Sequence, residues 1–323
     1  MKKQLVLVTG ATGNLGKYLV QELSDYGYAL RLIVRNEEKA LNSFKQLKPE
    51  LIILDLINAS EEDLFKACKG VDFVIHLAGS SDYSLSKQKL FELNAIPSGK
   101  IARAAKKAEV KKLVFASSTS LYHDTNGIKV TEETPLTPSN AYGESKIKAE
   151  KLIKESRVPF VFLRLTTMYG AGFETGFLQV AKMIKKEKMP LIGNGKNNIS
   201  LVHASDAANA FLKAIQTQTK NDAFIISSPP VTQTDCLNDL ADLLGVKPPS
   251  TKVPVAIALF LSYLDGFTSV FTGKRKLYPD YVRVLSSDRS FDCSKAAKML
   301  SWKPRVEFKD GLQEFVSSIN GRV

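Results

Sequence analysis

A tyrosine and a lysine four residues apart, Tyr142 and Lys146, are the side chains of this sequence best suited to proton transfer. Residues at this spacing lie on one face of a helix, one turn apart. A free phenol is a poor acid or base near neutrality, because its reference pKa is about 10. A neighbouring ammonium favours the phenolate, so we expect Lys146 to lower the pKa of Tyr142 towards the working range.

A run of hydroxyl side chains precedes this pair. Ser117-Ser118-Thr119 follows the apolar segment Leu113–Ala116, which has the character of a buried strand. A hydroxyl at a strand end can hydrogen-bond a carbonyl oxygen and polarise it. Tyr-x-x-x-Lys arises often by chance, but together with a strand-end serine and a glycine-rich turn it becomes specific.

The glycine-rich turn stands near the start of the sequence, at Gly10–Gly16. β-Prone apolar residues precede it and residues with helical spacing follow, which is the strand–turn–helix context of a dinucleotide pyrophosphate site. The glycines permit a tight turn, close approach of backbone to phosphate, and packing of helix on strand. The free N–H groups of the helix start attract the anion. The expected cofactor contacts are Gly10, Thr12, Gly13, Asn14, Leu15 and Gly16.

The ends of the following strands are expected to select the cofactor. Arg35 follows Leu30–Val34 at the place where NAD-selective enzymes carry an acidic residue for the ribose hydroxyls. A guanidinium pairs well with a 2′-phosphate, so the sequence predicts NADP. The alternative is that Arg35 only caps a surface strand and that either NADP or NAD binds. The next two strand ends add a carboxylate for the adenine amino group and small residues beside the cofactor: Asp55, Leu56, Ala78 and Gly79.

Apolar strands and amphipathic helices alternate through the first half, which predicts a Rossmann-type α/β fold with a doubly wound parallel sheet. The expected strands are 4–8, Leu30–Val34, Leu51–Leu54, Phe73–His76, Leu113–Ala116, Phe160–Leu163 and Phe224–Ser227. The expected helices are Asn36–Phe44, Glu61–Cys68, Lys87–Lys107, Tyr142–Ser156 and Ala204–Ala214.

Two domains are expected from this pattern. Residues 1–165, with 201–228 returning, form the NADP-binding domain, and 166–200 and 229–323 form a smaller substrate-binding lobe. The segment 229–323 reads as loop-rich and is expected to cap the carboxyl ends of the strands, where ligands of open α/β sheets bind.

Composition indicates a folded protein, with 44% hydrophobic and 24% charged residues among 323. The net charge of +12 suits an anionic cofactor, membrane or nucleic acid, but the lysines are spread along helices and no nucleic-acid recognition pattern accompanies them. We therefore expect a solvated basic surface and no nucleic-acid partner. The three cysteines are widely separated, which predicts reduced thiols of a cytoplasmic protein rather than disulfides or a metal site.

The segment Val255–Leu264 is apolar on every side. It is too short to span a bilayer, and Asp265 is expected to interrupt it. The favoured interpretation is a helix of the substrate lobe, partly core and partly pocket wall, which suits an apolar substrate. The other is an apolar lid or a shallow membrane contact through 253–276, with Lys274-Arg275-Lys276 providing positive charge.

These motifs together resemble the extended short-chain dehydrogenase/reductase superfamily, the NAD-dependent epimerase/dehydratase family, over essentially the whole length. The resemblance implies that Tyr142 exchanges the proton, that Lys146 holds the nicotinamide ribose, and that Ser118 binds the carbonyl, with Thr119 as the other choice. It implies that Asn94 supports a proton relay or braces the structure, and a homodimer is common in the family. The matching segments are Thr9–Gly16, His76–Gly79, Asn94, Phe115–Tyr122, Tyr142–Lys146, Leu163-Arg164, Met168–Gly170 and Val202–Asp206.

Two departures favour one branch of this superfamily. Thr167 stands where nucleotide-sugar enzymes commonly carry an asparagine, and Gly193–Asn198 leads into Ile199-Ser200 where they tend to carry Arg-Asp. The chain thus resembles the 3β-hydroxysteroid dehydrogenase and dihydroflavonol reductase branch. The implied activity is NAD(P)-dependent hydride transfer to or from a secondary alcohol or ketone on an apolar or ring-shaped small molecule. The alternatives are a nucleotide-sugar 4-epimerase or dehydratase, and a non-catalytic NADP-binding sensor, which has no need of the intact serine, tyrosine and lysine.

Overall fold

A seven-stranded sheet, all of whose strand pairs are parallel, forms the centre of the larger domain. The computed structural model describes residues 3–122, 128–173, 177–272 and 279–319. The strand order is β3-β2-β1-β4-β5-β7-β12, so the order reverses between β1 and β4, which is where ligands of open α/β sheets bind. The strands are β1 (Leu5–Thr9), β2 (Ala29–Val34), β3 (Glu50–Ile53), β4 (Phe73–His76), β5 (Lys112–Ser118), β7 (Phe160–Leu165) and β12 (Asp222–Ile226). The predicted doubly wound sheet is confirmed, and every expected strand lies within two residues of its predicted bounds.

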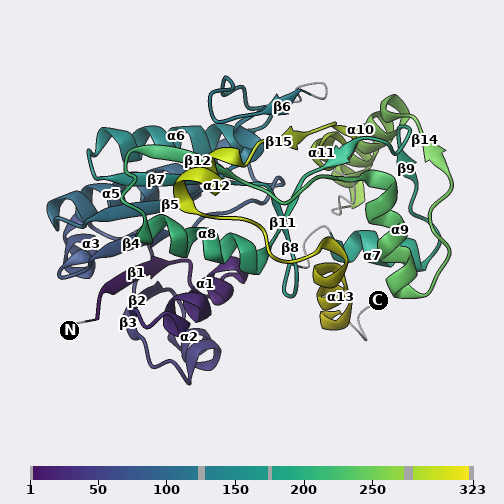
Figure 1. Ribbon diagram of the computed structural model, residues 1–323. Helices are drawn as coiled ribbons and strands as arrows, with labels where there is room; N and C mark the ends of the chain where they lie inside the picture. The colour runs from purple at the N-terminus through teal and green to yellow at the C-terminus, as the bar shows by residue number, and fades with distance from the viewer. Residues whose placement is uncertain (1–2, 123–127, 174–176, 273–278, 320–323) are drawn as a thin grey trace.

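Helices cover both faces of this sheet (Figure 1). Strand residues alternate between the two resulting cores, with Val6 and Val8 in one and Leu7 in the other. This two-sided burial explains why the strands read as continuous apolar runs. One face carries α1 (Asn14–Asp25), α2 (Glu37–Phe44), α8 (Ala204–Gln216) and α12 (Ser294–Leu300), and the other carries α3 (Glu61–Cys68), α5 (Ile96–Lys107) and α6 (Ala141–Glu155).

The long helical segment predicted over Lys87–Lys107 is continuous but not uniform. It consists of α4 (Lys87–Leu90), a π-helical turn η1 (Phe91–Ala95) and α5. The wider π turn holds Asn94, which is buried. Such turns often mark functional sites, because they redirect a side chain without ending the helix.

The smaller lobe has its own apolar core. Its helices α7 (Phe177–Lys185), α9 (Gln233–Leu244) and α13 (Phe308–Ser318) bury Leu240, Leu312 and Phe315 against one another. Short strand pairs connect the lobe internally and to the sheet domain: β8 (Thr167–Tyr169) with β11 (Leu201–His203), β9 (Leu191–Ile192) with β14 (Lys252–Val253), β10 (Asn198–Ile199) with β13 (Val231–Thr232), and β6 (Lys129–Val130) with β15 (Ser290–Phe291).

The expectation that 229–323 is loop-rich is wrong. This segment contains five helices, α9, α10 (Val255–Thr272), α11 (Pro279–Ser286), α12 and α13. The Thr232 hydroxyl caps α9, and Gly245 ends it with φ +69°. Asp265 does not interrupt α10, which continues to Thr272. No helix in the described part of the chain is long and apolar enough to cross a membrane.

One stretch of this segment packs on the sheet domain instead of the lobe. Ala296, Leu300 and Trp302 belong to the core between the sheet and α8. The Trp302 indole donates a 2.9 Å hydrogen bond to the carbonyl oxygen of Asp206. The stretch therefore differs from the expected assignment of all of 229–323 to the lobe, because its apolar residues complete the core beside β12.

Candidate active site

Helix α6 packs beside β5 and carries Tyr142 and Lys146. The Asn140 side chain accepts a 2.8 Å hydrogen bond from the Gly143 N–H and fixes the start of the helix. The Lys146 ammonium lies 5.9 Å from the centre of the Tyr142 ring, on the same helix face. It donates a 2.7 Å hydrogen bond to the carbonyl oxygen of Ala116. The predicted one-turn relationship between the two side chains is thus present.

Ser118 is the residue of the hydroxyl run whose side chain interacts with that of Tyr142. Its hydroxyl favours the ionised form of the Tyr142 phenol. Ser117 points from β5 towards α6, where its hydroxyl donates to Glu150, two turns beyond Tyr142. Thr119 donates instead to the carbonyl oxygen of Leu165. The geometry therefore brings Ser118, and not Thr119, to the tyrosine.

The protonation of the pair differs from the sequence expectation. Burial raises the pKa of Tyr142 above its usual value, Tyr83 adds to the increase, and the Ser118 hydrogen bond opposes it. Burial lowers the pKa of Lys146 to about 8, while Glu150 acts in the opposite direction. The expected lowering of the phenol pKa by Lys146 is wrong for this structure. The reason is that burial outweighs it and the ammonium is bonded to Ala116.

Asn94 connects the loop after β4 to α6. Its amide accepts from the Ser80 N–H at 2.7 Å and donates to the Ser80 carbonyl at 2.9 Å. It also donates to the Ser145 hydroxyl, which in turn donates to the carbonyl oxygen of Tyr142. The π turn thus holds Asn94 as a brace between the β4 end and the helix that carries Tyr142.

The glycine-rich turn has the shape that a pyrophosphate requires. Gly10 has φ +74°, and a Cβ there would lie 2.8 Å from the Ala78 nitrogen, so a side chain would force β1 and β4 apart. A Cβ at Gly16 would overlap the carbonyl oxygens of Gly10 and Ala11. Gly13 is exposed at the start of α1 and has no side chain to cap the helix N–H groups. These groups fit an anion of the cofactor.

The other expected contacts lie along the same edge of the sheet. Arg35 is exposed directly after β2, and Asp55 follows β3. The Asp55 carboxylate accepts hydrogen bonds from the Ile57 N–H and the Asn58 amide, so it is partly engaged in its own turn. Leu56 is buried, and Ala78 is half-buried and Gly79 exposed after β4. A Cβ at Gly79 would lie 3.7 Å from the Lys146 ammonium, so this strand end lies close to α6.

A family model for the NAD dependent epimerase/dehydratase family matches residues 6–227, a span that includes the glycine turn, Ser118 and α6. The chain belongs to this family. Its members are enzymes that use a nicotinamide dinucleotide, which agrees with the turn and the strand edge described above.

Relatives of this epimerase/dehydratase-family enzyme include proteins named as dehydrogenases and as epimerases. A mouse protein named sterol-4-alpha-carboxylate 3-dehydrogenase, decarboxylating, is 24% identical over 99% of this chain and 92% of its own length. A putative UDP-glucose 4-epimerase from Methanocaldococcus jannaschii is 25% identical over 97% of both chains. The crystal structure of a UDP-glucuronic acid 4-epimerase from Bacillus cereus in complex with NAD has a TM-score of 0.77 at 21% identity, covering 98% of both chains. That likeness supports the fold.

Two residues of the site were not found from the sequence. Tyr83, in the loop after β4, sets its ring edge-on to Tyr142, with 5.7 Å between ring centres. Arg289, just before β15, donates hydrogen bonds to the carbonyl oxygens of Thr119 at 3.1 Å and Tyr122 at 2.5 Å. Neither stands in a motif of the sequence.

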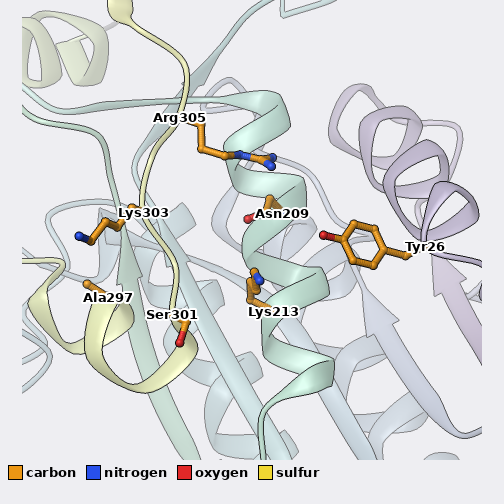
Figure 2. A pocket seen from close by; sticks show the side chains of 7 residues that line it. All are labelled: Tyr26, Asn209, Lys213, Ala297, Ser301, Lys303 and Arg305. Atoms are coloured by element: carbon orange, nitrogen blue, oxygen red, sulfur yellow. The ribbon is translucent and has the colours of Figure 1, made fainter.

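A separate surface pocket of about 420 Å³ lies on the α1 and α8 side of the sheet domain (Figure 2). Its lining includes Lys213, Lys303 and Arg305. Arg305 approaches two carboxylates, those of Glu22 at 3.8 Å and Asp206 at 3.6 Å. The pocket shares no lining residue with the site around Tyr142, and we assign it no role in the reaction.

Proposed function

We propose that the protein is an NAD(P)-dependent oxidoreductase that interconverts a secondary alcohol and a ketone on an apolar or ring-shaped substrate. The observation that carries the proposal is the Lys146 ammonium 5.9 Å from the centre of the Tyr142 ring, with Ser118 interacting with the same phenol. A substrate oxygen beside these two hydroxyls would meet both a proton source and a polarising donor. A non-catalytic sensor would have no use for this arrangement.

Each group of the site has a separate task in this proposal. When bound, the nicotinamide accepts or supplies the hydride at the substrate carbon. Tyr142 gives its phenolic proton to the carbonyl oxygen during reduction and takes it back during oxidation. Ser118 donates a hydrogen bond to the same oxygen, where negative charge develops. Lys146 is the residue that would hold the nicotinamide ribose and keep positive charge near the phenol.

The proposed cofactor is NADP, with NAD as the alternative. Arg35 supports NADP, because an exposed guanidinium at the end of β2 offers bidentate pairing to a 2′-phosphate. The glycine turn would hold the pyrophosphate with its backbone N–H groups. The Bacillus cereus structure contains NAD, which supports the alternative.

The proposed substrate class follows from the side chains at two positions where a nucleotide-sugar enzyme would bind the diphosphate. Thr167 and Ile199-Ser200 stand where a nucleotide diphosphate would need amide and guanidinium groups. The mouse sterol dehydrogenase is consistent with an apolar ring substrate. The second candidate function is a nucleotide-sugar 4-epimerase. The archaeal relative favours it, and so does Lys196, an exposed cation that could pair with a diphosphate.

The test is turnover of purified enzyme with NADPH or NADH and a panel of ring ketones, beside UDP-glucose as the epimerase substrate. We expect ketone-dependent oxidation of NADPH, and a loss of about 10²–10⁴-fold in kcat for Tyr142→Phe with unchanged cofactor affinity. NAD that copurifies and does not exchange, together with 4-epimerisation of UDP-glucose, would contradict the proposal.

A further inference from the structure

Helix α10 exposes a continuous apolar stripe. Twelve large apolar side chains of the described residues are strongly exposed, and five of them lie within Ile257–Leu264. Phe260 is the most exposed of the five, at 62%. Four follow the spacing i, i+3, i+4 and i+7, which places them on one face of a helix. They are Ile257, Phe260, Leu261 and Leu264.

The opposite face of α10 packs against neighbouring elements of the lobe. Ala258 is buried with Val282 of α11 and Ile192 of β9, and Val255 and Leu259 pack against this cluster. The outer stripe is therefore additional to the core. Its side chains are between 44% and 62% exposed, so they do not line a closed pocket. An isolated apolar patch of this kind marks an interaction surface.

Exposed cations lie on elements beside α10, together with the acidic residues Asp265 of α10 and Asp280 of α11. Residues Val255–Leu264 include no charged side chain, whereas Lys252 in β14 and Arg283 in α11 are exposed at its borders. Strand β14 pairs with β9, which follows the exposed Lys185, Lys186 and Lys188. Arg283 donates a 2.8 Å hydrogen bond to the hydroxyl of Tyr263, an exposed aromatic residue with an apolar ring and a polar end. Tyrosine of this kind is favoured at a membrane–water interface.

We propose that the α10 stripe docks the protein onto the surface of an anionic lipid bilayer. The apolar side chains would enter the boundary between headgroups and acyl chains, and the basic border would lie over anionic headgroups. A second copy of this chain fits less well, because a symmetric contact through α10 would bring the two basic borders together. The net charge of +12 favours the bilayer in the same way. This inference is independent of the proposed reaction.

The test is cosedimentation of the full chain with vesicles of phosphatidylcholine, or of phosphatidylcholine mixed with phosphatidylglycerol, without substrate or cofactor. We expect binding to the mixed vesicles, and a loss of about tenfold in partition coefficient when Phe260 and Leu261 are both changed to Glu. The matched control is Leu41→Glu on α2, because Leu41 is equally exposed, at 53%, but lies on the sheet domain. This control should bind within about twofold of the parent chain.

A second variant reports directly on the stripe. Trp302 is the single tryptophan and is buried, so Phe260→Trp places a new fluorophore on α10. We expect its emission to shift to shorter wavelength when mixed vesicles are added. Equal binding by the double variant and the parent chain, or no shift for Phe260→Trp, would overturn the proposal. So would a dimer in ultracentrifugation that the double variant makes monomeric while vesicles bind neither protein.

Discussion

The side chains of Thr9 and His76 meet at the point where the strand order of the sheet reverses, with 2.6 Å between the threonine oxygen and Nδ1 of the imidazole. Nε2 of the same ring lies 2.9 Å from the Ser98 hydroxyl, which donates its own proton to the carbonyl oxygen of Asn94. Ser98 therefore accepts from Nε2–H, and Nδ1 accepts from Thr9. The neutral ring connects β1, β4 and the π turn that holds Asn94.

This connection predicts a loss of stability in acid. Burial, with a smaller contribution from Lys146, lowers the pKa of His76 to about 3 in the folded protein, against 6.5 for an unperturbed imidazole. Between these two values the His76 imidazole is protonated in the unfolded chain but neutral in the folded chain. The free energy of unfolding should thus fall as the pH drops from 6.5 towards 3, by up to about 1.4 kcal/mol per pH unit.

The measurement is urea unfolding at a series of pH values. His76→Gln keeps one donor and one acceptor but does not titrate, so its stability should change less with pH over this range. A variant with the same pH dependence as the parent chain would show that other groups cause the acid loss.

Ser118 and Thr119 give a matched pair for the carbonyl-binding hydroxyl. Ser118→Ala removes the hydroxyl that interacts with the Tyr142 phenol, and we expect kcat to fall about 10²–10³-fold, as for loss of one oxyanion donor. Thr119→Val removes only the hydrogen bond to the Leu165 carbonyl and should leave kcat within about fivefold. The measurement is steady-state turnover of both variants. A larger loss for Thr119→Val would exchange the two assignments.

The sheet and the core of the site could be predicted because their signals are local. Parallel strands buried on both faces leave continuous apolar runs, and caps such as the Ser60 hydroxyl at the start of α3 fix helix starts. The spacing of Tyr142 and Lys146 depends on one helix. The choice of Ser118 over Ser117 depends on which residue of β5 lies beside each turn of α6, and the sequence does not show this.

The rest could not be predicted because it depends on contacts between distant segments. Arg289 reaches Thr119 across 170 positions, and Tyr83 meets Tyr142 from a loop without a motif. The lobe helices α9 and α13 are stabilised by each other, so their short amphipathic patterns resemble loops until Leu240 and Phe315 are seen together. The pKa of Tyr142 likewise depends on burial by the whole site.

The pH dependence of kcat/KM should reflect the titration of Lys146. Burial lowers its pKa to about 8, so the ammonium loses its proton as the pH rises through that value. If positive charge beside the phenol is required, kcat/KM should fall above about pH 8. Tyr142 does not explain such a decline, because burial raises its pKa further.

Lys146→Arg keeps a positive charge at this position but removes its titration near pH 8. Arginine stays protonated in this range, so the variant should be slower but should lack the decline above about pH 8. The measurement is kcat/KM for the parent chain and the variant at each pH, with saturating cofactor. Retention of the decline in the variant would assign it to another group.

Arg35 decides between the two cofactors. Arg35→Asp replaces the exposed cation after β2 by the acid that NAD-selective enzymes carry, so we expect the Kd for NADPH to rise about tenfold or more and the Kd for NADH to change little. The measurement is nicotinamide fluorescence titration. Lys39→Asp is the control, because it makes the same charge change on the exposed surface of the adjacent α2. If both variants weaken NADPH binding equally, Arg35 acts only through its general positive charge. Only a residue that pairs with the 2′-phosphate distinguishes the two dinucleotides.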